Sequence, residues 1–140
     1  MEASVVWNGN MSFTGTANSG FTVELDADTG VGGDNGGFRP MELIAMGLVG
    51  CTAMDVISIM KKKRQDVTRF EVKTHLEQAE QHPKVFTKAV IEYIFYGRNL
   101  DPAAAERSIE LSEKRYCPAQ GMLNQVMPIE LKYTLIEESE

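Results

Sequence analysis

The sequence predicts one α+β domain spanning residues 1–140, in which antiparallel sheets are wrapped round a central buried helix in the order βββ-α-ββ-α-β. Three observations predict this fold. Several short segments alternate apolar and polar residues with a period of two, which is typical of strands. One long segment repeats apolar residues every three or four positions, which is typical of a helix. The length of 140 residues suits a single hydrophobic core.

The N-terminal part, residues 1–26, is expected to form a meander of three antiparallel strands. The strand-like segments are residues 5–7, 11–16 and 21–25. They are separated by the runs Asn-Gly-Asn and Asn-Ser-Gly, which favour tight turns.

The next segment, residues 27–38, is rich in glycine. Five of the eight residues from 30 to 37 are glycine, and no Gly-Lys-Ser/Thr follows them. Because glycine loses much conformational entropy on ordering, the pattern predicts a mobile loop rather than a phosphate-binding cradle.

Residues 39–64 are expected to form the central helix, with Cys51 near its middle. Pro40 suits the first helical turn, where its missing N–H costs nothing. Three lysines and an arginine at 61–64 complement the negative end of the helix dipole. Apolar residues occupy most of the helix circumference, so the helix needs cover on every side. We therefore expect an obligate homodimer.

The second half of the chain predicts a long hairpin over residues 67–97 and a helix–strand unit over 101–136. The hairpin pairs segments 68–78 and 86–96, and the second of these has Ala89, Ile91, Tyr93 and Phe95 on one side. Asp101 and Pro102 begin a helix expected to reach about Tyr116, where Cys117-Pro118 stops it. Its expected buried stripe is Ala105, Ile109, Ser112 and Tyr116. A short helical piece holding Met122 and Leu123 and a strand over 128–136 complete the order.

Composition and charge narrow the possible functions. The net charge of −6 and the pI near 5.0 argue against a nucleic-acid partner, because an acidic chain repels phosphates. The first residues lack a secretory pattern, and the uncharged run 43–54 is too short to span a bilayer. We therefore expect a cytoplasmic protein with no membrane partner. With two histidines and no Cys-x-x-Cys, neither a Cys/His metal site nor a cofactor is expected.

The two cysteines are the candidates for chemistry. Cys51 lies in the most apolar segment and reads either as an inert buried thiol or as a reactive one. Cys117 reads either as a small apolar residue at a helix end or as the second member of a thiol pair. The 66 positions between them fix no distance. The histidines, His75 and His82, are expected to be exposed and without a catalytic role.

Two motifs around these cysteines resemble those of the OsmC/Ohr family, the osmotically inducible and organic hydroperoxide resistance proteins. The first runs from Pro40-Met41-Glu42-Leu43-Ile44 through Gly50-Cys51 to Asp55-Val56-Ile57-Ser58-Ile59. The second is Glu113-Lys114-Arg115-Tyr116-Cys117-Pro118. The expected element order also follows the family, so the resemblance covers nearly the whole chain.

The resemblance implies an intertwined homodimer with its active sites at the subunit interface. It implies a thiol peroxidase in which Cys51 attacks an organic hydroperoxide, Cys117 resolves the sulfenic acid, and a dithiol or lipoyl-type reductant restores both thiols. The alternative is a non-enzymatic member that binds a small apolar ligand at the dimer interface.

The family's peroxidases also use an N-terminal arginine and a glutamate near the helix start. No arginine or lysine precedes Arg39 in this chain, and Met41 occupies the glutamate position when Pro40 and Cys51 are aligned. Arg39 and Glu42 are therefore the remaining candidates for these two roles. Glu42 lies nine residues before Cys51, which places it on the opposite side of a continuous helix.

Overall fold

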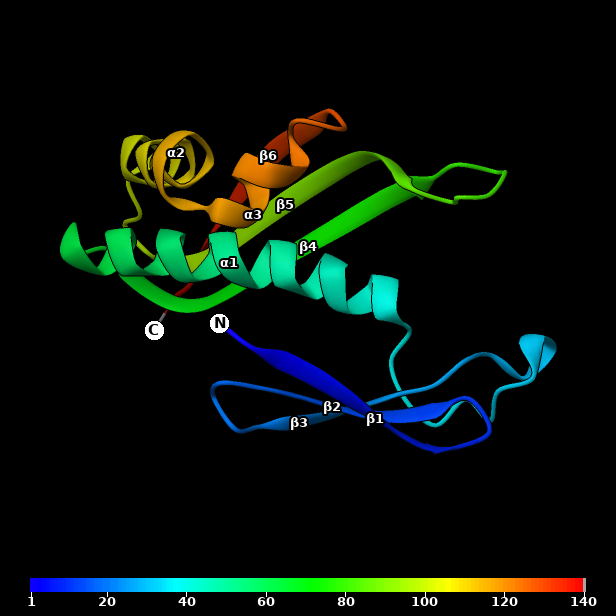
Figure 1. The fold of residues 1–140 in the computed structure, drawn as a ribbon. Helices are drawn as coiled ribbons and strands as arrows, with labels where there is room; N and C mark the ends of the chain where they lie inside the picture. Colours follow the sequence, from blue (N-terminus) through cyan, green and yellow to red (C-terminus); the bar gives the residue numbers. More distant parts are fainter. Residues whose placement is uncertain (140) are drawn as a thin grey trace. The chain divides into compact units, whose positions relative to one another are not determined.

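The computed structural model describes residues 1–139 and divides into two units. The first comprises residues 1–44, and the second begins at Ala45. The described elements follow the expected α+β order and are drawn in Figure 1.

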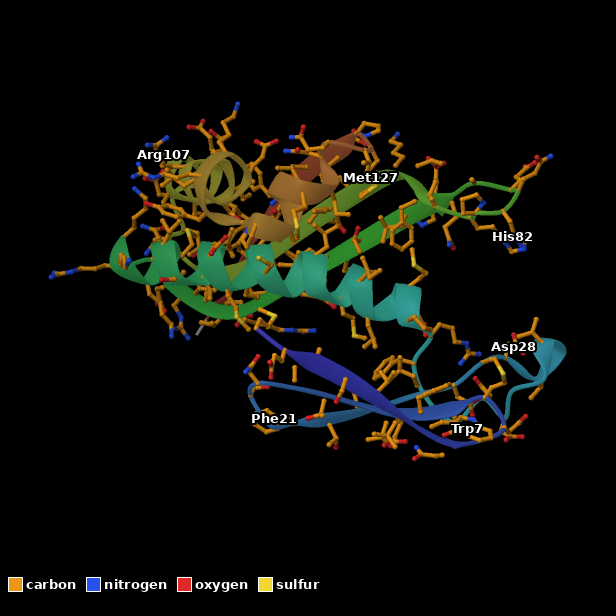
Figure 2. All side chains as sticks on the ribbon, in the orientation of Figure 1. Trp7, Phe21, Asp28, His82, Arg107 and Met127 are labelled. Atoms are coloured by element: carbon orange, nitrogen blue, oxygen red, sulfur yellow. The ribbon has the colours of Figure 1, made fainter. Side chains whose placement is uncertain are left out.

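The first unit contains a three-stranded antiparallel sheet in the order β1-β2-β3. Its strands are β1 (Ala3–Gly9), β2 (Ser12–Ala17) and β3 (Thr22–Leu25), which confirms the predicted meander. Trp7 and Phe21 leave much of their surface exposed on this unit (Figure 2).

The glycine-rich segment is organised around the carboxylate of Asp26. This carboxylate accepts backbone N–H bonds from Ala27 at 2.7 Å and from Gly36 at 3.0 Å. The bond from Ala27, followed by those from Gly36 and Asp34, lowers the pKa of Asp26. The segment also holds one short 3-10 turn, Thr29–Val31. The mobility of the glycine-rich segment stays a prediction. Its glycines allow close packing as well as conformational freedom.

Helix α1 (Pro40–Lys62) is continuous and confirms the predicted central helix. Only one stripe, with residues at intervals of four, is fully buried: Leu48, Thr52, Val56 and Met60. The rest of the helix is partly or largely exposed, and Met54 keeps 73% of its surface accessible. By length and composition alone, α1 could cross a membrane. The core helix of a soluble protein can have the same length and composition.

The sheet of the second unit has the order β4-β5-β6. Strands β4 (Asp66–Gln78) and β5 (Phe86–Arg98) form the predicted antiparallel hairpin. Strand β6 (Ile129–Glu137) pairs with β5 in parallel, so the expectation of purely antiparallel sheets was wrong. The physical reason is the long connection after β5. Its helices carry the chain back, as a parallel crossover requires.

One face of this sheet carries the core of the second unit. From β5, four side chains with no exposed surface point to this face: Ala89, Ile91, Tyr93 and Phe95. Apolar residues of the buried stripe of α1 cluster there with those of α2 (Pro102–Leu111). Figure 1 shows the two helices on the same side of this sheet. The predicted buried face of β5 is thereby confirmed.

The connection between β5 and β6 departs in part from the prediction of a regular helix to Tyr116. Helix α2 stops at Leu111 and a π-helical turn covers Ser112–Tyr116. Helix α3 follows over Pro118–Leu123 and confirms the short helical piece predicted at Met122 and Leu123. A π turn holds an extra residue, which shifts the faces of the residues after it. Tyr116 is therefore half exposed rather than part of the buried stripe, whereas Ser112 is buried as predicted.

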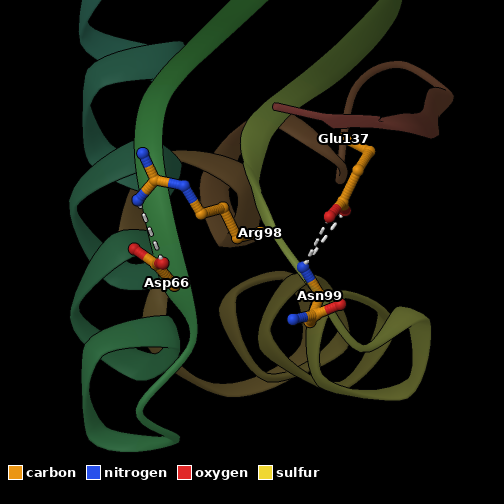
Figure 3. A network of polar contacts seen from close by, with 4 residues as sticks. All are labelled: Asp66, Arg98, Asn99 and Glu137. Carbon is orange, nitrogen blue, oxygen red and sulfur yellow. Dashed lines mark hydrogen bonds and ion pairs between the residues drawn. The ribbon is translucent and has the colours of Figure 1, made fainter. Parts of the chain in front are cut away.

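Polar contacts hold the end of the sheet at the start of this connection (Figure 3). Arg98 pairs with Asp66 across β4 and β5 at 3.4 Å. Beside it, the backbone N–H of Asn99 donates to both carboxylate oxygens of Glu137 at 3.1 Å. The contacts join the ends of all three strands, from which the chain turns toward α2.

Candidate thiol site

The second unit brings the two predicted cysteines together. Cys51 lies on α1 and is half-buried, whereas Cys117 follows the π turn and is 4% exposed. Both are free thiols, and Cys51 lies near enough to Cys117 to contribute, after burial, to raising its pKa. The two cysteines are therefore neighbours in the fold.

The surroundings of Cys117 keep its thiol protonated. Burial raises the pKa of Cys117 to about 11, and the neighbouring Cys51 thiol acts in the same direction. The backbone N–H of Gln120 opposes this rise by donating to the Cys117 sulfur at 3.4 Å. Since only thiolates are strong nucleophiles, this raised pKa makes Cys117 a poor first nucleophile at neutral pH.

A buried network of hydroxyl and amide groups lies next to the thiols. The Thr52 hydroxyl is 2.7 Å from the Tyr93 hydroxyl and 2.7 Å from that of Ser112, and it accepts from the Gln120 amide at 3.1 Å. The Ser112 hydroxyl donates to Asp55 at 3.0 Å. All of these residues except Asp55 are fully buried, and desolvation raises the pKa of Tyr93 to about 12.

Sequence reasoning placed Tyr93 and Ser112 on buried faces but did not join them, and it missed Thr52 and Gln120. One signal was available, because a buried phenol hydroxyl requires a partner. The partner could not be identified, since Thr52 and Tyr93 lie 41 positions apart in the sequence.

The other two predicted site residues, Arg39 and Glu42, belong to the first unit and have local partners there. The Glu42 carboxylate accepts from the backbone N–H of Arg39 at 2.8 Å and so caps the start of α1. The Arg39 guanidinium donates to the carbonyl of Gly37 at 3.0 Å. Its charge also contributes to lowering the pKa of Asp26 and Asp28.

The histidines are exposed, as predicted. His75 lies on β4, and His82 lies in the loop between β4 and β5 (Figure 2). Over residues 1–139, no three His, Cys, Asp or Glu side chains are grouped so as to hold a metal ion.

The chain is thus a small α+β protein with two free cysteines close together, Cys51 on α1 and Cys117 after the π turn. The family model of OsmC-like proteins matches residues 32–132, which include both cysteines. The chain therefore belongs to the OsmC-like family, as its motifs predicted.

Individual relatives agree with this assignment. Protein YhfA of Escherichia coli strain K12 is 36% identical over 136 residues, which are 97% of this chain and 98% of YhfA. An OsmC-like protein from Mycoplasma pneumoniae shares the fold with a TM-score of 0.81 at 18% identity, covering 96% of both chains. An organic hydroperoxide resistance protein OsmC from Legionella pneumophila has a TM-score of 0.71 at 14% identity, covering 95% of both.

Proposed function

We propose that the protein is a thiol-dependent peroxidase that reduces organic hydroperoxides in oxidative or osmotic stress defence. The observation that carries the proposal is that the free thiol of Cys51 neighbours the buried free thiol of Cys117. Family membership and the fold shared with the Legionella hydroperoxide resistance protein support the same chemistry.

The proposed reaction has two steps at the protein. The Cys51 thiolate attacks the terminal oxygen of the hydroperoxide, and the O–O bond breaks. The alkoxide takes up the proton that Cys51 released on ionising and leaves as the alcohol. Cys51 is thereby oxidised to a sulfenic acid. The Cys117 sulfur then attacks the Cys51 sulfur, and the S–O bond breaks. The proton of Cys117 leaves with the hydroxide as water. An external dithiol, such as a lipoyl-type reductant, reduces the disulfide and becomes a disulfide itself.

Arg39 and Glu42 have proposed supporting roles. Arg39 would supply a positive charge that stabilises the attacking thiolate, and Glu42 would hold the segment that carries Arg39 through its bond to the Arg39 backbone. The family resemblance and the exposed apolar surface of α1 also support a cytoplasmic homodimer.

Mass spectrometry after treatment with cumene hydroperoxide tests this function. We expect a Cys51–Cys117 disulfide in the wild type and faster reaction with cumene hydroperoxide than with hydrogen peroxide. Cys51→Ser should abolish peroxide consumption, whereas Cys117→Ser should allow one turnover and then sulfinic acid at Cys51. If both thiols stay reduced, the peroxidase proposal fails and binding of a small apolar ligand replaces it.

A further inference from the structure

The hydroxyl of Thr52 is the hub of the buried network beside the thiols. It has three polar neighbours within 3.1 Å, the side chains of Tyr93, Ser112 and Gln120. These neighbours come from β5, the π turn and α3, so one oxygen joins four segments of the second unit. Thr52 itself has no exposed surface.

Two of these neighbours hold Cys117 through its backbone or its sulfur. The Ser112 carbonyl accepts from the Cys117 N–H at 2.8 Å, and the Gln120 N–H donates to the Cys117 sulfur at 3.4 Å. Thr52 directly follows Cys51 on α1. Thr52, the neighbour of Cys51, is therefore hydrogen-bonded to the two residues that also bond to Cys117.

Asp55 orders the hydrogen bonds of the network. Ser112 donates its single hydrogen to the Asp55 carboxylate, so it must accept from Thr52. Thr52 has then used its own hydrogen, and it accepts from both Tyr93 and Gln120. Each hydroxyl group of this network therefore donates its hydrogen to one defined acceptor. This order favours a single arrangement of the segments that carry the cysteines.

We infer that Thr52 is a positioning residue for the thiol pair. Its hydroxyl fixes the segment around Cys117 against α1, so that the two sulfurs can form a disulfide. The inference rests on the proposed use of Cys51 and Cys117 as a redox pair. It assigns to Thr52 no contact with the peroxide.

The test is a redox titration of the purified protein against reduced and oxidised dithiothreitol. This measurement needs no peroxide, so it separates the inference from the proposed function. In Thr52→Val the hydroxyl is lost at nearly constant shape. We expect the equilibrium constant for the Cys51–Cys117 disulfide to fall about tenfold, which raises the reduction potential by about 30 mV.

Two variants serve as controls. Thr52→Ser keeps the hydroxyl and should retain the wild-type potential. Ser108→Ala removes another fully buried hydroxyl, which donates to the Ala105 carbonyl at 2.8 Å and, within residues 1–139, lies outside the network. It should lower thermal stability without moving the potential. If Thr52→Val does not fold, Ser112→Ala and Gln120→Leu carry the test and should move the potential in the same direction.

The results separate positioning from general stability. A wild-type potential in folded Thr52→Val would overturn the inference, as would an equal shift in Ser108→Ala. If Ser112→Ala and Gln120→Leu are used in place of Thr52→Val, wild-type reduction potentials in both variants would also overturn the inference. If cumene hydroperoxide leaves the thiols reduced but the titration gives the expected pattern, the peroxidase proposal fails while the role of Thr52 stands.

Discussion

The backbone N–H of Cys117 donates a 2.8 Å hydrogen bond to the carbonyl of Ser112, five residues earlier in the chain. This bond closes the π turn between α2 and α3. The same turn directs the Ser112 hydroxyl to Thr52 on α1. The π turn makes the helical segment irregular. It also holds the backbone of Cys117 and places Ser112 in the network beside the thiols.

The two thiols should differ sharply in alkylation. At pH 7, iodoacetamide should modify Cys51 well before Cys117, because burial raises the pKa of Cys117 to about 11 and leaves little thiolate there. Peptide mass spectrometry over time checks the order of modification. Denaturant provides the control, since unfolding should make the two rates similar. Equal rates in the native protein would contradict the assignment.

Stability should fall at alkaline pH. The folded-state pKa of Cys117 is about 11, above its ordinary value near 9, so the folded state retains a proton that the unfolded state loses. The stabilisation is complete below pH 9 and disappears as pH rises toward 11. Urea unfolding at pH 7, 9 and 10.5 measures the decline. Cys117→Ala should decline less, although burial of Tyr93 leaves it some alkaline sensitivity.

Asp26 should stabilise the glycine-rich segment in a pH-dependent way. Backbone N–H bonds, led by that of Ala27, lower its pKa in the folded state, so its contribution is present at neutral pH and lost as pH falls through that pKa. Asp26→Asn should therefore reduce the melting temperature at pH 7 but hardly at pH 2. Asp34→Asn is the control, because the Asp34 carboxylate accepts a side-chain amide rather than this set of backbone bonds. Equal losses in both variants would count against a special role for Asp26.

Gly33 should tolerate no side chain. A Cβ atom there would lie 2.0 Å from the Ala27 carbonyl oxygen, so Gly33→Ala requires the backbone to move. We expect a loss of about 2 kcal/mol or more in unfolding free energy, measured by urea titration. Gly30→Ala is the matched control, since a Cβ at Gly30 meets its nearest atom only at 4.0 Å. A smaller loss at Gly33 than at Gly30 would show that packing does not select this glycine.

Arg39→Ala should slow the reaction with hydroperoxide. Loss of the Arg39 charge should remove stabilisation of the attacking thiolate, and a tenfold slower reaction would correspond to about 1.4 kcal/mol. Stopped-flow kinetics with cumene hydroperoxide measure the change, and Arg39→Lys should recover part of the rate. An unchanged rate in Arg39→Ala would remove Arg39 from the proposed site.

Light scattering should find a stable dimer at micromolar concentration. The single chain leaves apolar side chains of α1 exposed, and Met54 is the most exposed of them. Such surface is usually covered by a partner. Met54→Glu should weaken the dimer if this part of α1 lies in the interface. A stable wild-type monomer would exclude the predicted assembly.

The sequence by itself determined the elements whose signals are local. Alternation gave the buried face of β5, Pro40 set the start of α1, and Cys117-Pro118 ended the helical run formed by α2 and the π turn, because backbone sterics and side-chain period act over a few residues. The two cysteine motifs likewise indicated the family that the comparisons confirm.

Only the tertiary structure decided how these elements meet. The parallel pairing of β6 with β5 depends on how the long connection packs, and the π turn gives no periodic signal strong enough to predict. The contact between Cys51 and Cys117 and the hub at Thr52 join residues 41 to 68 positions apart. Packing of the whole unit fixes such distances, because the sequence spacing between distant residues specifies no geometry.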